Sequence, residues 1–143
     1  MIARIESSRS EGPEVSLLDH IGFPVSDYTR SKTFYEKALT PLGYTLLMEV
    51  QQTENDHPAA GFGAGGKPDF WIGGEGGLNQ CVHIAFATRD RASVDAFYRA
   101  AIAAGGRDNG GPGVRALYHP NYYAAFVFDP DGHNIEAVCH APA

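Results

Sequence analysis

Val82-His83-Ile84-Ala85-Phe86-Ala87-Thr88-Arg89-Asp90 decides the fold of this chain, because an earlier stretch, Asp19-His20-Ile21-Gly22-Phe23-Pro24-Val25-Ser26-Asp27, has nearly the same pattern. The two histidines lie 63 residues apart, and so do the two aspartates that end the stretches. Without a gap, 8 of 26 positions are identical between residues 19–44 and 82–107. A repeat on this scale predicts two copies of one structural unit, each opening with a histidine on a strand.

Each copy is predicted to fold as β-α-β-β-β. Ser26 or Asp27 in the first copy and Asp90 in the second are natural N-caps for an amphipathic helix, because a side-chain oxygen there accepts from the first free amides. In the first copy the expected strands are Leu17–Val25, Tyr44–Val50, Ala59–Gly63 and Asp69–Gly73. In the second copy they are Cys81–Thr88, a short strand near 107–109, Val114–His119, Tyr122–Phe128 and Asn134–Cys139. The sequence therefore predicts an α+β fold of two tandem modules, at about 17–74 and 80–140, within a single domain at 17–143.

Composition limits the classes of function. A chain of 143 residues with 43% hydrophobic residues is sufficient for one globular core. The formal net charge of −6 disfavours nucleic acid and anionic membranes as partners, because both are bound through basic patches. Two cysteines are too few for a disulfide framework and favour a cytoplasmic location. Residues 1–16 are polar, without the apolar stretch of a signal peptide, and are expected to be a flexible arm.

Three side chains could form a metal site. His20 and His83 hold the same place in the two copies, and Glu136 lies on the last, otherwise apolar, strand. A carboxylate on such a strand is unfavourable unless it is paired or ligated. A single strand histidine is more often a packing or surface residue than a ligand. Two at equivalent positions together with a strand carboxylate, however, match a known set of ligands for a divalent ion.

Each copy opens with a histidine on a strand, followed by an aspartate and a helix, and the second copy closes with Phe126-Val127-Phe128-Asp129-Pro130-Asp131-Gly132-His133-Asn134-Ile135-Glu136. In these features the chain resembles the glyoxalase/bleomycin-resistance/extradiol-dioxygenase superfamily, also called vicinal-oxygen-chelate proteins. The resemblance covers about residues 17–140. It implies curved mixed sheets around a metal-bearing cleft. It also implies that His20, His83 and Glu136 are the metal ligands, and that short members of this kind are often homodimers, with the site formed within one chain or across two.

One departure from the family pattern concerns the fourth ligand that glyoxalase I usually has on the last strand of its first module. Here that position falls near Trp71, and Asp69 would be displaced by two residues, about 6.6 Å along a strand. We therefore expect three ligands, with Asp69 left open as a fourth and Trp71 as a wall of the substrate site. A three-ligand site resembles ring-cleaving dioxygenases or thiol transferases more than glyoxalase I proper.

Further candidates gather before the closing strands. His119 and Tyr123 are predicted as catalytic acid–base residues. Tyr118, Tyr122 and Arg115 are predicted to bind substrate, Arg115 through an anionic group, although aromatic residues on strands are mostly packing residues. His133, in the turn, is expected to be solvated.

No nucleotide cofactor is expected. Gly61-Phe62-Gly63-Ala64-Gly65-Gly66-Lys67 has the spacing of a phosphate-binding loop, but Pro68 follows where the Mg²⁺-binding hydroxyl of Ser or Thr is required.

The resulting hypothesis is a cytoplasmic, homodimeric metalloenzyme that holds one divalent ion (Fe²⁺, Mn²⁺, Zn²⁺ or Ni²⁺). Its small substrate would chelate the ion through vicinal oxygens, and the reaction would be isomerisation or lyase chemistry, thiol transfer or extradiol-type ring cleavage. The alternative is a non-catalytic protein that sequesters a small molecule, as in the bleomycin-resistance branch.

Overall fold

The computed structural model describes residues 20–53, 57–74 and 81–143. The predicted arm at 1–16 lies outside these ranges. The order of elements is β1 (Ile21–Pro24), α1 (Tyr28–Leu39), the 3-10 turn η1 (Thr40–Leu42), β2 (Thr45–Val50), β3 (Ala59–Ala64), β4 (Lys67–Gly73), β5 (His83–Ala87), α2 (Arg91–Ala103), β6 (Arg107–Asp108), β7 (Gly113–Val114), β8 (Tyr123–Phe128) and β9 (Asn134–Cys139).

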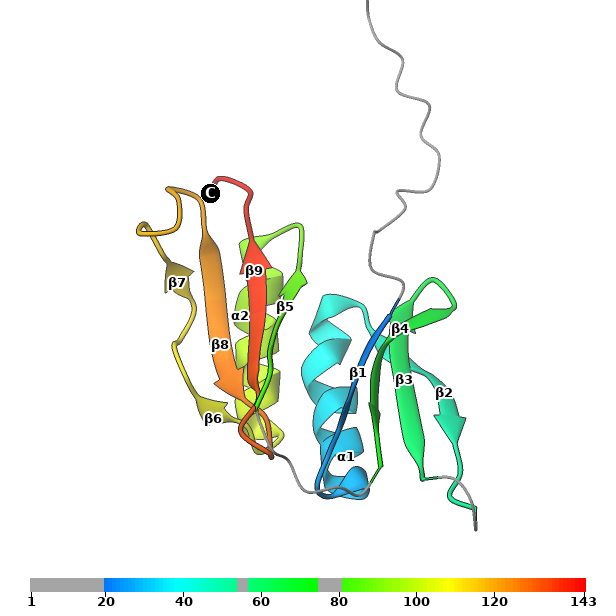
Figure 1. Cartoon of the computed structure of the whole chain (residues 1–143). Coiled ribbons are helices and arrows are strands. Elements are labelled where there is room, and N and C mark those ends of the chain that lie inside the picture. Colours follow the sequence, from blue (N-terminus) through cyan, green and yellow to red (C-terminus); the bar gives the residue numbers. More distant parts are fainter. Residues whose placement is uncertain (1–19, 54–56, 75–80) are drawn as a thin grey trace, which may run out of the picture.

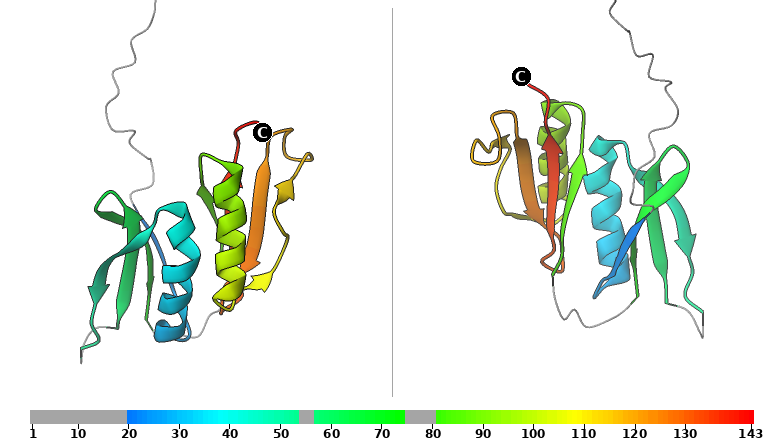
Figure 2. Two further views of the ribbon diagram at one scale, coloured as in Figure 1. Left: turned by 180° about the vertical axis from the view of Figure 1, so that it is seen from behind. Right: turned by 45° about the horizontal axis from the view of Figure 1, so that its top comes forward.

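The two copies form two sheets of matching topology. The first has the order β1-β4-β3-β2, and the second has the order β5-β9-β8-β6, with β7 also paired to β8. In each sheet the opening strand pairs in parallel with the closing strand, and the remaining pairs are antiparallel. Helices α1 and α2 pack against each other between the two sheets (Figures 1 and 2). The predicted α+β fold of two β-α-β-β-β units with mixed sheets is confirmed.

The helices begin where the repeat predicts. The side chain of Asp27 accepts from the amide of Arg30, and that of Asp90 accepts from the amide of Ser93, so both aspartates are N-caps. In α1 the buried positions Phe34, Tyr35 and Ala38 recur at helical spacing, as do Phe97 and Ala101 in α2.

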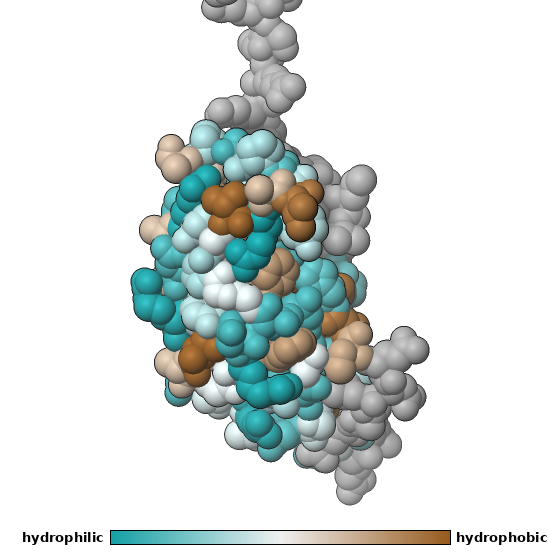
Figure 3. Space-filling model, turned by 90° about the vertical axis from the view of Figure 1, so that its left-hand side faces the viewer, coloured by the Kyte–Doolittle hydropathy of each residue, from teal (hydrophilic) through white to brown (hydrophobic). Residues whose placement is uncertain are grey.

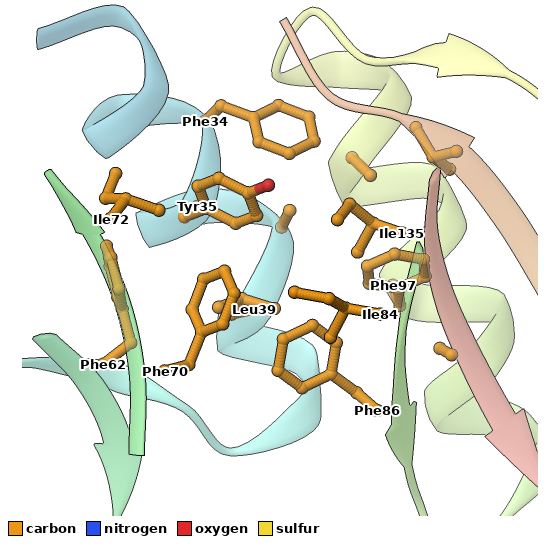
Figure 4. Close-up of a cluster of buried hydrophobic side chains, with 14 of the residues drawn as sticks. Phe34, Tyr35, Leu39, Phe62, Phe70, Ile72, Ile84, Phe86, Phe97 and Ile135 are labelled. Atoms are coloured by element: carbon orange, nitrogen blue, oxygen red, sulfur yellow. The ribbon is translucent and has the colours of Figure 1, made fainter. Parts of the chain in front are cut away.

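One core is shared by the two modules. Phe70 of β4 lies 5.2 Å from Phe86 of β5, measured between ring centroids, and Tyr44 lies 5.6 Å from Phe86. Figure 4 shows Phe62, Phe70 and Ile72 pointing from the first sheet, and Ile84, Phe86 and Ile135 from the second, toward the region around α1. Because rings from both halves contact each other, neither sheet buries its apolar face alone.

The prediction of a strand at Val114–His119 was wrong beyond its first residue, since the observed strand is Gly113–Val114. The chain turns instead, with the amide of Tyr118 bonded to the carbonyl of Arg115 and the amide of Tyr122 to the carbonyl of His119. Pro120, which cannot donate to a ladder, lies inside the second turn. In the described ranges no helix has the length and apolar character needed to cross a bilayer.

Candidate functional site

The predicted ligands His83 and Glu136 lie together on the second sheet. His83 Nε2 is 3.0 Å from Glu136 Oε2, and the side chains are 51% and 2% exposed. Parallel pairing places Ala85 opposite Glu136, so His83, two residues before Ala85, projects from the same face. This is the outer face of the sheet, because the alternate residues of β9, Ile135 and Ala137, enter the core.

Tyr122 covers the carboxylate of Glu136. Its hydroxyl donates to Glu136 Oε1 at 2.5 Å. Burial, helped by this hydrogen bond and by the negative charge of Glu136, raises the pKa of Tyr122 to about 12. The phenol is therefore protonated at neutral pH, and it acts as a hydrogen-bond donor rather than as a base.

Three other predicted residues, Tyr118, His119 and Arg115, lie near Tyr122 or on the same face. Tyr118 packs edge-on against Tyr122 at 4.9 Å, and the ring of His119 lies 5.4 Å from it. His119 Nε2 is 2.7 Å from Nδ1 of His140, a residue for which the sequence suggested no role. The guanidinium of Arg115 lies over Phe126, which is paired in register with Glu136.

Tyr123 lies on the opposite face of β8. Its hydroxyl donates to Asp95 of α2 at 2.6 Å, and Arg91 stacks on its ring at 5.0 Å. The hydrogen bond to Asp95 and burial both raise the pKa of Tyr123. The structure therefore separates Tyr123 from the face that carries Glu136, and an acid–base role for it has no support in this geometry.

His20 lines a groove between the two modules. The groove has a volume of about 430 Å³, and its walls also include His83 and Asp69. Strands β1 and β5 run in opposite directions along it (Figure 1), so the histidine just before β1 and the histidine that begins β5 lie toward opposite ends. Tyr44 donates to Asp69 Oδ2 at 3.0 Å, which engages the carboxylate considered as a fourth ligand.

Among the residues that the structure describes, only one trio of potential metal donors has its atoms within 4.8 Å of one another, and it is Asp129, Asp131 and His133. The trio of His20, His83 and Glu136 does not meet that distance within one chain. The predicted metal ligands therefore remain a prediction, with His83 and Glu136 adjacent and His20 elsewhere along the groove.

The trio in the turn after β8 has other uses for its donor atoms. Asp129 accepts from the hydroxyl of Tyr35 and from the amides of Asp131 and His133, and Asp131 accepts from the amide and hydroxyl of Ser26. His133 Nδ1 accepts from the amide of Val82. Neutral imidazole has one lone-pair nitrogen, so this bond competes directly with metal binding.

The cluster therefore ties the second module to the first. His133 is 1% exposed and packs against Phe23 of β1 at 4.4 Å between ring centroids, so the expectation that it is solvated was wrong. The turn directs its ring inward, a consequence of tertiary packing that residue type alone does not indicate. The cluster can bind a cation through His133 only if the hydrogen bond from the amide of Val82 is given up.

Trp71 occupies the place in the first module that Glu136 holds in the second. Trp71 pairs with Gly22 in the parallel ladder, as Glu136 pairs with Ala85. Its indole lies over Gly61, where an added Cβ would stand 2.7 Å from the ring. Gly22, Trp71 and Gly73 line a shallow, largely apolar depression of about 310 Å³. The first sheet thus presents an aromatic surface where the second presents a carboxylate.

The family model of the Glyoxalase/Bleomycin resistance protein/Dioxygenase superfamily matches residues 17–137. The chain belongs to this superfamily. Solved structures agree with the assignment. A glyoxalase/bleomycin resistance protein from Albidiferax ferrireducens T118 is 28% identical with a TM-score of 0.68, and the match covers 89% of this chain and all 100% of that one.

Two further structures support the fold alone. A glyoxylase/bleomycin resistance protein/dioxygenase domain from Frankia sp. EAN1pec has a TM-score of 0.67 at 16% identity, covering 87% of this chain and 98% of that one. Glyoxalase I from Zea mays has a TM-score of 0.66 at 22% identity, and the match covers 88% of this chain but only 45% of that enzyme. No curated protein matches the sequence.

The superfamily includes enzymes such as glyoxalase I as well as non-enzymes, and its members commonly bind a divalent metal ion. The residues on the second sheet fit such an ion. Glu136 is a buried carboxylate next to an imidazole nitrogen, and both are common ligands of Zn²⁺, Fe²⁺, Mn²⁺ and Ni²⁺. The remaining face of the ion would be left to a third ligand and to substrate.

Proposed function

We propose that this protein is a divalent-metal-dependent enzyme whose small substrate chelates the ion through two neighbouring oxygens. The observation that carries the proposal is the Glu136 carboxylate, 2% exposed and 3.0 Å from His83 Nε2. Burying a carboxylate is unfavourable without compensation, and a bound cation would supply it. A protein that only sequesters a small molecule has no need of His83 and Glu136 together.

Bound at His83 and Glu136, the ion would act as a Lewis acid that stabilises the oxyanion or enolate formed on the substrate. The surrounding residues have separate roles in this proposal. Tyr122 donates to Glu136 and fixes its orientation. His119, which contacts Tyr122, is the proposed acid–base residue, and Tyr118 lies beside it as a wall of the substrate site. Isomerisation, thiol transfer and oxidative ring cleavage all fit this arrangement.

We further propose that the third ligand is the partner subunit's His20. Within one chain the described donor atoms of His20, His83 and Glu136 do not come within 4.8 Å of one another, and β1 and β5 run in opposite directions. Members of the superfamily commonly form dimers. A second copy that lays its β1 beside β5 would bring the missing imidazole to the His83–Glu136 pair while leaving each chain's own core intact.

Metal content tests the site. Protein loaded with Zn²⁺ or Fe²⁺ is expected to hold about one ion per chain, measured by elemental analysis after gel filtration. Glu136→Gln and His83→Ala should each weaken metal binding by more than the roughly 100-fold that loss of an outer partner can cost. Glu49→Gln and His57→Ala, which alter an exposed carboxylate and an exposed imidazole, are the matched controls. If Glu136→Gln retains metal at the wild-type level, the proposed site is wrong.

Mixing two variants tests the cross-subunit arrangement. His20→Ala and Glu136→Gln are each expected to bind no metal when purified alone. After exchange of subunits, a heterodimer would contain one intact site, so metal should return to about a quarter of the wild-type sites in a random mixture of dimers. If both variants lose metal and the mixture recovers none despite verified exchange, each site is formed within a single chain.

A further inference from the structure

We propose that Arg115 forms an anion-binding subsite beside the His83–Glu136 pair, and that the substrate therefore carries a carboxylate or phosphate group. The placement of the rest of the substrate assumes the metal site proposed above, but the anion subsite itself can be tested without metal. Arg115 follows β7 (Gly113–Val114), and its guanidinium carbon lies 5.5 Å from the centroid of the Phe126 ring.

The guanidinium is held in one orientation by the backbone around it. Its Nη2 donates to the carbonyl of Gly111 at 2.7 Å, and the amide of Arg115 donates to the carbonyl of Tyr122 at 2.7 Å. Stacking on Phe126 fixes the plane of the fork. An arginine that is already ordered loses less side-chain entropy when it binds a ligand, and its remaining N–H groups suit the two oxygens of a carboxylate or phosphate.

Two glycines make room for the fork. A Cβ added at Gly110 would lie 3.1 Å from Nη2, and one added at Gly113 would lie 3.0 Å from Nη1, both tighter than ordinary contact. Gly110 also has a φ of +134°, which disfavours any residue with a side chain. The loop therefore brings bare backbone to both terminal nitrogens of Arg115.

No carboxylate in the described parts of the chain neutralises this charge. The ion pairs within 4.0 Å that the structure records there join Lys32 to Glu49 and His83 to Glu136, and neither involves Arg115. The nearby carboxylate of Asp108 accepts from Tyr98 and from the amide of Gly110 instead. In a protein with a formal net charge of −6, a fixed and unpaired arginine is a local attraction for anions.

Phe126 links this subsite to the proposed metal site. Its ring contacts Arg115, and it also stacks on the ring of His83 at 6.3 Å between centroids with an interplanar angle of 24°. On the backbone, Phe126 is paired in register with Glu136. A ligand whose chelating oxygens approach His83 and Glu136 can therefore extend across the Phe126 ring and reach the guanidinium with an anionic group.

Access to this region is open. Val114 and Tyr118, on either side of Arg115, are 45% and 66% exposed. Figure 3, which views the side of the molecule that carries β6 and β7, shows a largely hydrophilic surface interrupted by separate hydrophobic patches. A small polar anion can reach Arg115 without displacing a packed element.

Two titrations test the subsite. In metal-free protein, the Nε–Hε resonance of Arg115 is followed by NMR during addition of benzoate or inorganic phosphate, and a saturable shift is expected. In metal-loaded protein, calorimetry compares catechol with 3,4-dihydroxybenzoate, which differs by one carboxylate. The carboxylated probe should bind at least about 10-fold more tightly, the factor expected for a hydrogen-bonded charge pair.

Arg115→Gln should remove that preference, whereas Arg99→Gln, which makes the same charge change at an exposed position on α2, should preserve it. Arg115→Lys, which keeps the charge without the fork, should retain part of the preference. A stronger NMR response to phosphate than to benzoate would identify a phosphoester as the anion, and the reverse a carboxylate. Absence of a saturable shift, or an unchanged preference in Arg115→Gln, would overturn the subsite, whereas failure to load metal would overturn only the metal site.

Discussion

The two modules share a backbone plan but differ at the centre of their outer faces. In the first module Trp71 lies between Gly22 and Gly61, its cross-strand neighbours. In the second, the equivalent Glu136 lies between Ala85 and Phe126. The glycines leave space for a flat indole, whereas the second module surrounds a carboxylate with His83 and Tyr122.

Equivalent positions in the two modules therefore carry side chains with different functions. The ladder fixes which positions face outward, and the size of the cross-strand neighbours decides which side chain fits there. A charged residue at the Trp71 position would lack the hydrogen-bonding partners that Glu136 has in the second module. One module thus offers an apolar surface, and the other offers the charge.

The core supplies the largest expected effect and tests whether the modules are one cooperative unit. Phe70 and Ile135 are equivalent positions, each paired with the isoleucine that follows the opening histidine. Phe70→Ala should cost about 3–5 kcal/mol and Ile135→Ala about 2–5 kcal/mol in free energy of unfolding. Urea unfolding followed by circular dichroism should show one transition for each variant, because Phe70 contacts Phe86 across the modules.

Two separate transitions, with Phe70→Ala shifting only one of them, would contradict a shared core. Hydrogen exchange of β3 and β8 in the same variants is the independent measure. Both strands should lose protection together.

A smaller effect is expected at the repeated tyrosines Tyr35 and Tyr98. Tyr35 is fully buried and donates to Asp129 at 2.7 Å, whereas Tyr98 donates to Asp108 at an exposed site at 3.0 Å. Tyr35→Phe should cost about 1.5–3 kcal/mol, because it removes a donor from a buried carboxylate. Tyr98→Phe, the matched control, should lower the free energy of unfolding far less. Equal losses of unfolding free energy in the two variants would show that burial does not strengthen the hydrogen bond of Tyr35.

The pH dependence of this effect has a definite sign. Burial raises the pKa of Asp129, while the Tyr35 hydroxyl and the amide of His133 oppose the rise. A raised carboxyl pKa favours the folded state below the ordinary value near 3.8, and this contribution is lost as pH rises through the folded pKa. Without the Tyr35 hydroxyl, the pKa of Asp129 should rise further, because the ionised carboxylate loses a donor. The loss of unfolding free energy in Tyr35→Phe should therefore be larger at pH 7 than at acid pH, as measured by urea unfolding at each pH.

The repeat made the fold predictable, because His20 and His83 mark equivalent strands and Asp27 and Asp90 cap equivalent helices. Trp71 lies opposite Gly22 as Glu136 lies opposite Ala85, which agrees with the position near Trp71 that the family resemblance implied for the fourth ligand of glyoxalase I. Glu136 could be singled out because a carboxylate on an apolar strand requires compensation. Phe126 lies opposite Glu136 because the loop of residues 129–133 closes Phe128 onto Asn134, one residue more than a tight turn at 129–132 would contain.

Other features depend on tertiary contacts that local pattern does not encode. His133 lies in a polar turn, where exposure is expected, yet packing against Phe23 buries it. The alternation of side chains along β8 places Tyr122 and Tyr123 on opposite faces, but it does not indicate which of them faces Glu136. That depends on the register of β8, which puts Tyr122 on Glu136 and Tyr123 on Asp95. The contact between His119 and His140 joins the loop before β8 to the residue after β9, and the sequence around either histidine does not predict it.

The most direct test of the account is the position of the metal ion in crystals grown with Co²⁺ or Zn²⁺, located by anomalous diffraction. We predict a peak within bonding distance, about 2.0–2.2 Å, of His83 Nε2 and a Glu136 oxygen, with the partner subunit's His20 as third protein ligand. A peak at Asp129, Asp131 and His133, or an ordered ion elsewhere with the His83–Glu136 pair unchanged at 3.0 Å, would contradict the account.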